Sequence, residues 1–171
     1  LYPLPNKTNV RSIETGADNH IYAGGQDELG YFAPAGNGRL QYVSLTQLID
    51  STHRSFGDVW DIVSSGRDIF FRTLTKIFQY NGRTITVYPA SSEWWFLGKS
   101  NNMLYAHDHT KGLYVFNQNK WQPAVPINPL PASDPVTSIL DGENGTSIIT
   151  TLKNGLFRLS SNSLTAISSP N

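Results

Sequence analysis

The chain has 171 residues, of which 39% are hydrophobic, 12% aromatic and only 15% charged, and its 13 basic and 13 acidic residues cancel to a formal net charge of zero. This balance argues against the basic surface with which proteins bind nucleic acid or anionic membranes. Cysteine is absent, which excludes disulfides and thiolate metal sites. No apolar stretch reaches the roughly 18–20 residues of a membrane-spanning helix.

The first predicted unit covers residues 9–45 and consists of four short β-strands. Its first apolar stretch ends at "GADN" (16–19), where Gly, Asp and Asn supply positive φ angles or cap a turn with their own side chains. A compact apolar stretch and the aromatic segment "LGYF" (29–32) follow. The link to the next unit contains "SLTQLIDS" (44–51), which has a pattern compatible with a helical turn.

The second predicted unit, residues 58–90, repeats this order of strands and turns. The turn "SSGRD" (64–68) precedes the aromatic segment "KIFQY" (76–80). The last segment, "RTITVY" (83–88), alternates polar and apolar residues, as a strand with one solvated face does. Between these two segments, Asn81-Gly82 predicts a two-residue hairpin turn.

The third and fourth predicted units cover residues 93–125 and 135–169. "GLYVFNQNKW" begins at Gly112 and "GLFRLSSNSL" at Gly155, so nearly the same phrase recurs after 155 − 112 = 43 residues. A repeat of this length is typical of stacked supersecondary units.

We therefore predict an all-β fold of four four-stranded antiparallel β-propeller blades. The alternative is a β-sandwich, which does not need the same turn and aromatic segment at the same place in every unit. Four blades are the lower limit for a closed propeller, and an open arc exposes an apolar face at each end. We expect residues 1–171 to form a partial propeller, completed by further blades of the same protein or by a second copy in a homodimer.

The repeat has the form V-x-S-I … G … I-x-x-T … G-L-F/Y-R/V-F/L, most clearly in "VTSILDGENGTSIITTLKNGLFRL" (136–159). This form is similar to the two-component regulator propeller repeat. "GGQDELGYF" (24–32), "DVWDIV" (58–63) and "NGRTITVY" (81–88) also resemble the periplasmic sensor region of bacterial proteins in which a three-tyrosine β-sandwich follows the propeller.

The resemblance implies a propeller of about seven blades, located on the periplasmic, extracytoplasmic side of a bacterial inner membrane. It also implies a sensor that binds a ligand, often a carbohydrate, and signals to a downstream histidine kinase or DNA-binding module. The sequence departs from the family where Tyr22, Phe70, Tyr105 and Ile149 replace the usual Trp of the second strand, and where Lys76-Ile77 replaces Gly-Leu. The ligand contacts of the family therefore do not transfer to this chain.

The loops between second and third strands, and the loops that enter each blade, are expected around the channel mouth of a propeller. Their polar side chains suit a polyhydroxylated ligand, and Trp60 and Trp94 offer flat apolar faces to a sugar ring. The alternative for both Trp residues is packing between blades as core. The predicted ligand-binding residues are Gln26, Asp27, Glu28, Arg72, Trp94, His107, Asp108 and Lys153.

No cofactor or catalytic residue is predicted. "HDH" (107–109) holds two metal-ligand types but no third ligand at a fixed spacing, so we predict no metal site. The sequence contains no nucleophile elbow, phosphate-binding Gly loop or HExxH motif. The ligand-sensing hypothesis stands beside two others, a scaffold that binds a protein partner and a propeller glycoside hydrolase or lyase. No direct contact with nucleic acid or membrane is expected.

Overall fold

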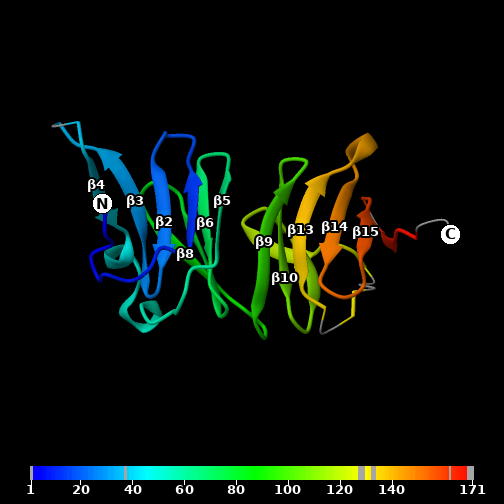
Figure 1. Cartoon of the computed structure of the whole chain (residues 1–171). Coiled ribbons are helices and arrows are strands. Elements are labelled where there is room, and N and C mark those ends of the chain that lie inside the picture. The colour runs from blue at the N-terminus through cyan, green and yellow to red at the C-terminus, as the bar shows by residue number, and fades with distance from the viewer. Residues whose placement is uncertain (1, 37, 127–129, 132–133, 162, 169–171) are drawn as a thin grey trace. The chain divides into compact units, whose positions relative to one another are not determined.

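A computed structural model describes the chain except residues 1, 37, 127–129, 132–133, 162 and 169–171. It consists of four four-stranded antiparallel sheets, in each of which the strands follow one another in chain order (Figure 1). This arrangement confirms the predicted all-β fold and its four sheets. The chain divides into two compact units, Leu1–Ala90 and Ser91–Asn171, with two sheets in each.

In the first unit, one sheet contains β1 (Ser12–Thr15), β2 (Ile21–Gly25), β3 (Glu28–Pro34) and β4 (Leu40–Ser44). The other contains β5 (Asp61–Ser65), β6 (Asp68–Arg72), β7 (Lys76–Tyr80) and β8 (Ile85–Pro89). Two short 3-10 helices, η1 (Thr46–Leu48) and η2 (Ser51–His53), join the sheets. They confirm the helical turn predicted there, although η2 begins at the last residue of the predicted range and extends beyond it.

In the second unit, one sheet contains β9 (Trp94–Ser100), β10 (Met103–Asp108), β11 (Gly112–Asn117) and β12 (Lys120–Pro123). The other contains β13 (Val136–Asp141), β14 (Ser147–Thr151), β15 (Leu156–Leu159) and β16 (Leu164–Ala166). A third 3-10 helix, η3 (Glu143–Gly145), forms the β13–β14 turn. No helix among the described residues is long and apolar enough to cross a membrane.

The core of the first unit lies between its two sheets. Side chains of both sheets meet in one buried cluster, to which the link between the sheets contributes Leu45, Ile49, Phe56 and Val59. The close approach of β2 to the link before β5 depends on Gly24, because a Cβ atom at Gly24 would lie 2.5 Å from the Val59 side chain. The Ser12 hydroxyl also donates to the carbonyl of Val59 at 2.8 Å. The first strands of the two sheets are therefore held together at their N-terminal ends.

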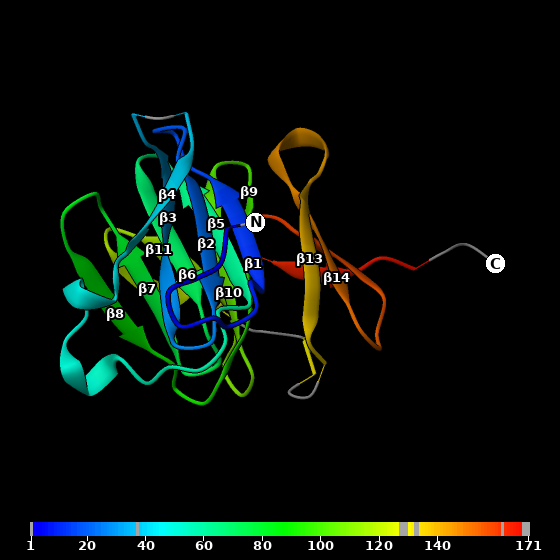
Figure 2. The same ribbon diagram turned by 60° about the vertical axis from the view of Figure 1, so that its left-hand side comes forward.

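The N-terminal segment, residues 2–9, covers part of the other side of sheet β1–β4. Leu4 is buried there in a small cluster with Ala23 and Phe32. Gly25 permits this contact, since a Cβ at Gly25 would lie 2.6 Å from the carbonyl oxygen of Asn9. Figure 2 shows the dark blue segment passing over β2 before it reaches β1. An uncovered apolar face was predicted at this end, and part of it is instead covered by the chain's own N-terminal segment.

The second unit buries a comparable cluster, which Leu113 and Val125 form with Ile139, Ile149 and Phe157. A polar contact joins the two sheets at the β9–β10 turn. Asp141 accepts hydrogen bonds from the Ser100 hydroxyl at 2.9 Å and from the backbone N–H of Asn101 at 2.8 Å. The opposite side of sheet β13–β16 exposes Leu140 and Leu156. Arg158 is exposed on the same side, so this face is mixed rather than purely apolar, and an open apolar face on the last blade remains a prediction.

Two hairpins use paired residues with positive φ, Asn101-Asn102 and Gln118-Asn119. The predicted two-residue turn at Asn81-Gly82 is wrong. Because Tyr80 pairs with Ile85, the β7–β8 loop has four residues, and only Gly82 among them has positive φ. The Asn81 carboxamide oxygen accepts from the N–H groups of Arg83 and Thr84, at 3.0 and 2.9 Å. The Asn81 side chain thus provides a hydrogen-bond acceptor for the N–H groups of the four-residue loop, and a tight two-residue turn is not needed.

Candidate ligand-binding site

Three aspartates fix the loops at the ends of the second strands. In the first unit, Asp27 Oδ1 accepts hydrogen bonds from the backbone N–H groups of Phe56 and Gly57, both at 2.7 Å. In the second unit, Asp108 Oδ2 accepts from Ser91 and Ser92 in the loop before β9, at 3.0 and 3.1 Å. Each of these carboxylates therefore ties the loop after a second strand to a loop that enters a blade.

Asp134 forms the same kind of clamp from the opposite side. It lies before β13 and accepts from the N–H groups of Lys153 and Asn154, which follow β14, at 2.7 and 3.0 Å. The Asn154 side-chain amide donates a further bond at 2.6 Å. Asp134 is not among the ligand-binding residues predicted from the sequence, and this role was not predicted. The sequence does contain a sign of it, because "SD" (133–134) lies in a loop that enters a blade and "KN" (153–154) in a loop after a second strand, and such loops are expected to lie together.

Burial and hydrogen bonding act in opposite directions on the pKa values of Asp108 and Asp134. Burial alone raises the pKa of Asp108, but bonds from Ser92, Lys111 and Thr110 outweigh it and hold the pKa below its usual value. Asp134 follows the same pattern, with its pKa lowered by bonds from Asn154, Thr151 and Lys153 against the effect of burial. Both side chains therefore stay ionised inside the protein, with their charge stabilised by N–H donors.

Five of the predicted ligand-binding residues are buried, namely Glu28, Arg72, Trp94, His107 and Asp108. Glu28 accepts from the hydroxyls of Tyr42 and Ser44, and Arg72 pairs with Asp61. Of the other three, Gln26 and Lys153 are exposed and Asp27 is half-buried. Gln26, Asp27, Glu28 and Arg72 belong to the first unit and the rest to the second. Ligand contact by these eight remains a prediction, and the buried five have structural partners or packing.

His107 is only 1% exposed, and its Nδ1 accepts from the backbone N–H of Val136 at 3.5 Å. Burial lowers the pKa of His107 to about 4, and the nearby charge of Asp108 offsets this only in part. The imidazole is therefore neutral at physiological pH. Among the residues that the structure describes, no group of three or more His, Cys, Asp or Glu side chains is placed to hold a metal ion.

The two tryptophans proposed as sugar platforms have different surroundings. Trp94 is 3% exposed, which confirms the alternative that it packs as core. Trp60 is 44% exposed, so the same alternative is wrong for Trp60. The guanidinium carbon of Arg11 lies 5.6 Å from the centroid of the Trp60 ring, within the range of a cation–π interaction.

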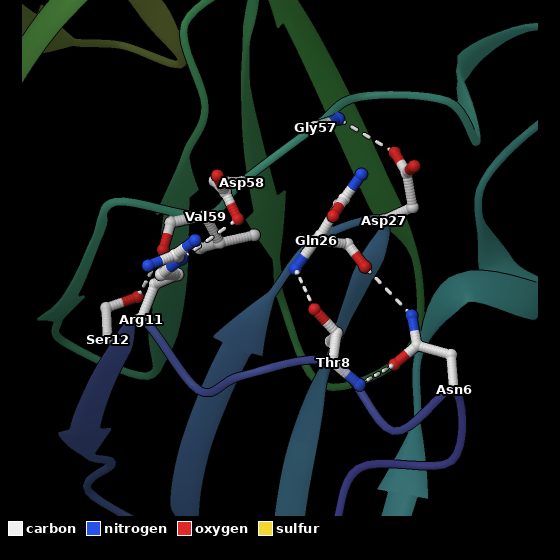
Figure 3. A network of polar contacts seen from close by, with 9 residues as sticks. All are labelled: Asn6, Thr8, Arg11, Ser12, Gln26, Asp27, Gly57, Asp58 and Val59. Atoms are coloured by element: carbon white, nitrogen blue, oxygen red, sulfur yellow. Dashed lines mark hydrogen bonds and ion pairs between the residues drawn. The ribbon is translucent and has the colours of Figure 1, made fainter.

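Trp60 belongs to a polar cluster near the N-terminal ends of β1 and β5. Arg11 Nε donates to Asp58 Oδ1 at 3.1 Å, and Gln26 forms an isolated antiparallel bridge with Asp58 (Figure 3). We call Arg11, Gln26, Asp58 and Trp60 the Arg11–Trp60 cluster. Gln26 and Trp60 were predicted from the sequence as candidate ligand contacts. Arg11 was not, because the pairing of Arg11 with Asp58 joins residues 47 positions apart.

The N-terminal segment holds one side of this cluster. The Asn6 amide donates to the carbonyl of Gln26 at 2.8 Å, and the N–H of Gln26 donates to the Thr8 hydroxyl at 3.3 Å. The Gln26 side chain extends away from Asn6 and Thr8, on the other side of the backbone (Figure 3). Its backbone is thus fixed by the segment while its amide stays exposed.

A second aromatic surface lies in the other unit. The ring of Trp95 stacks on that of His109, with centroids 3.9 Å apart and planes inclined by 15°. Trp95 Nε1 donates to Glu93 at 2.9 Å. Trp94 is the residue predicted from the sequence, but successive residues of a strand point to opposite faces, and Trp95 is the one that is partly exposed.

A hollow of about 690 Å³ also occurs in the second unit, between the β13–β14 turn and Arg158. Its lining combines Asp141, Glu143 and Arg158 with Ile148, and contains no aromatic side chain. It therefore lacks the flat apolar surface that favours a sugar ring. The Arg11–Trp60 cluster is the better candidate for a carbohydrate site.

No family model and no curated protein matches the sequence. Among solved structures, virginiamycin B lyase from Staphylococcus aureus is 16% identical, with 99% of this chain and 59% of that chain covered and a TM-score of 0.70. The extracellular domains of two hybrid two component systems from B. thetaiotaomicron are also similar. One is 16% identical over 100% of this chain and 23% of that chain, and the other 17% over 96% and 25%, with TM-scores of 0.68 and 0.67.

The chain thus spans little more than half of the lyase and about a quarter of the extracellular domains. These neighbours include the class of protein to which the sequence repeat pointed. At such low identity the likeness shows the fold, and the four sheets are blades of a β-propeller.

Proposed function

We propose that this chain is an extracytoplasmic ligand-sensing propeller segment of a bacterial two-component-type regulator and that its ligand is a carbohydrate. The observation that carries the proposal is an exposed Trp60 held beside Arg11, Gln26 and Asp58. A flat apolar ring surrounded by exposed polar groups is the usual composition of a sugar-binding surface. The solved extracellular domains of two component systems support the cellular setting.

Sensing requires no bond making in this segment. A ligand that binds one arrangement of the propeller more tightly than another shifts the population toward it, and the shift reaches a downstream kinase or DNA-binding module. Further blades of the same protein, or a second copy, complete the propeller in this proposal. The exposed Leu140 and Leu156 on the last sheet support such a cover, because large apolar faces are unfavourable in water.

A glycan array followed by calorimetry tests the proposal. We expect at least one oligosaccharide to bind, and we expect Trp60→Ala to weaken that binding about fivefold or more, since stacking on an aromatic ring contributes about 1 kcal/mol. Leu48→Ala is the matched control, because Leu48 is similarly exposed but lies on η1. A stable complex with another protein, without binding of any glycan, would favour the scaffold function instead.

The similarity to virginiamycin B lyase supports a second candidate, a propeller lyase. Incubation of the chain with virginiamycin B tests it directly. Turnover that depends on an exposed acid or histidine would establish an enzyme, and the sensing proposal expects the antibiotic to be recovered intact.

A further inference from the structure

The Arg11–Trp60 cluster leaves specific donor and acceptor atoms available. Arg11 uses Nε to bind Asp58 Oδ1. Within the described part of the chain, nothing bonds to the two terminal guanidinium nitrogens of Arg11 or to Asp58 Oδ2. Their side chains are 43% and 24% exposed, so both can be reached from solvent. A pair of free donors therefore lies next to a free acceptor, and the ion pair itself fixes their relative position.

A hydroxyl group both donates and accepts a hydrogen bond, and neighbouring hydroxyls of a pyranose present both functions side by side. One hydroxyl can accept from the Arg11 guanidinium while its neighbour donates to Asp58 Oδ2. Trp60 supplies the flat apolar surface for the C–H face of the same ring. The exposed amide of Gln26, across its bridge with Asp58, offers a further donor and acceptor.

The charge of the cluster is balanced. Arg11 contributes one positive charge, Asp58 one negative charge, and Gln26 none. A carboxylate or sulfate on the ligand is attracted by the positive charge of Arg11 but is repelled at short range by the negative charge of Asp58. Such repulsion between like charges is strong near a protein surface. A neutral ligand avoids the conflict and uses both partners of the ion pair.

From these observations we infer that the Arg11–Trp60 cluster binds a neutral pyranose in preference to an acidic sugar, with Arg11 and Asp58 hydrogen-bonded to two neighbouring hydroxyls. This inference rests on the proposed carbohydrate-binding function and deepens it.

Matched oligosaccharides of the same glycosidic linkage and length provide the test, namely galactose against galacturonate oligomers and glucose against glucuronate oligomers. With linkage and length held constant, each pair differs only in the oxidation of C6. Isothermal titration calorimetry with the 171-residue chain is expected to show at least tenfold tighter binding of a neutral member. A tighter acidic member would overturn this inference and leave carbohydrate sensing intact. Binding of no sugar in the glycan array would overturn both.

Two variants locate the effect. Arg11→Lys keeps the charge but removes the planar pair of donors, and we expect it to weaken binding of the neutral sugar about tenfold. Asp58→Asn gives the cluster a net positive charge, so the ratio of neutral to acidic affinity should fall. Arg67→Lys is the control, because Arg67 is an exposed arginine on the β5–β6 turn of the same unit. Unchanged affinity in both test variants, with thermal unfolding as in the parent chain, would contradict the inference.

Discussion

Asp108 shows how a buried charge is accommodated in this protein. Both of its oxygens receive N–H or hydroxyl donors, from Ser91 and Ser92 before β9 and from Thr110 and Lys111 after β10. Its side chain is fully buried. A buried carboxylate with this many donors stabilises the loops that it joins, and its removal leaves several N–H groups without a partner.

We predict that Asp108→Asn destabilises the chain by about 1–3 kcal/mol, because one acceptor oxygen becomes an N–H₂ group that faces other donors. Asp27→Asn is the informative comparison. Asp27 uses a single oxygen for both of its bonds, so an amide oxygen can replace it, and we expect a loss below about 1 kcal/mol. Denaturant unfolding measures both. Equal losses would show that the second oxygen of Asp108 is unimportant.

The protonation of His107 makes stability depend on pH. Its pKa is about 4 in the folded protein and about 6.5 in an unfolded chain. As the pH falls, the unfolded state therefore takes up the proton before the folded state does. The contribution of neutral His107 to the free energy of unfolding is full above pH 6.5 and decreases as the pH falls toward 4, by at most ~1.4 kcal/mol per pH unit. His107→Gln should remove this slope. The free energies of unfolding of the parent chain and of His107→Gln, measured between pH 7 and 4, test this prediction. The same pH dependence in both proteins would contradict it.

At this scale the sequence predicts which loops carry polar groups but not which side chains are exposed. Trp94 and Trp95 differ by one position, and only the strand register decides which of them is buried. A β-bulge between His107 and Asp108 changes that register locally. Arg11 could not be predicted as a site residue, because its partner Asp58 is distant in sequence.

At the scale of elements, the N-terminal segment is the feature that the sequence does not predict. Residues 2–9 have no periodic pattern, and their place on sheet β1–β4 depends on the space that Gly25 leaves. The sixteen strands found among the described residues, in contrast, follow closely from alternation and from turn residues. The failure at Asn81-Gly82 arises because an Asn side chain can cap a longer loop as well as form a tight turn.

The segment yields a prediction of its own. Leu4 is buried against Ala23 and Phe32, so Leu4→Ala should cost about 2–5 kcal/mol. Val10→Ala, at an exposed position, should stay within about 0.5 kcal/mol of the parent. Thermal or denaturant unfolding compares them. A mild effect of Leu4→Ala would mean that the segment detaches readily and contributes little.

At the scale of the molecule, repeat spacing predicts the four sheets, because each turn and aromatic segment recurs at the same place. The number of blades in a complete propeller does not follow from the repeat spacing. In repeat proteins a unit packs only against its neighbours, so the local sequence pattern is the same whatever the size of the ring.

The two sides of the last sheet should respond differently to charge. Ile149 is fully buried between sheets, and Ile149→Lys should unfold the second unit, since an unpaired buried charge is very unfavourable. Leu140 is 57% exposed, and Leu140→Lys should change the unfolding free energy by less than about 0.5 kcal/mol. Amide hydrogen exchange would reveal both effects. Strong destabilisation by Leu140→Lys would show that this face is already covered.

The hydrogen bonds that join Asn6 and Thr8 to the backbone of Gln26, one donated by Asn6 and one accepted by Thr8, have a practical consequence for binding experiments. A linker that pulls on the N-terminus loads Gln26 directly and, through its bridge, Asp58. Immobilising the chain on a sensor chip by that end would therefore strain the surface under study. Attachment through the C-terminus applies the force of the linker to the second unit and leaves the geometry of the Arg11–Trp60 cluster undistorted.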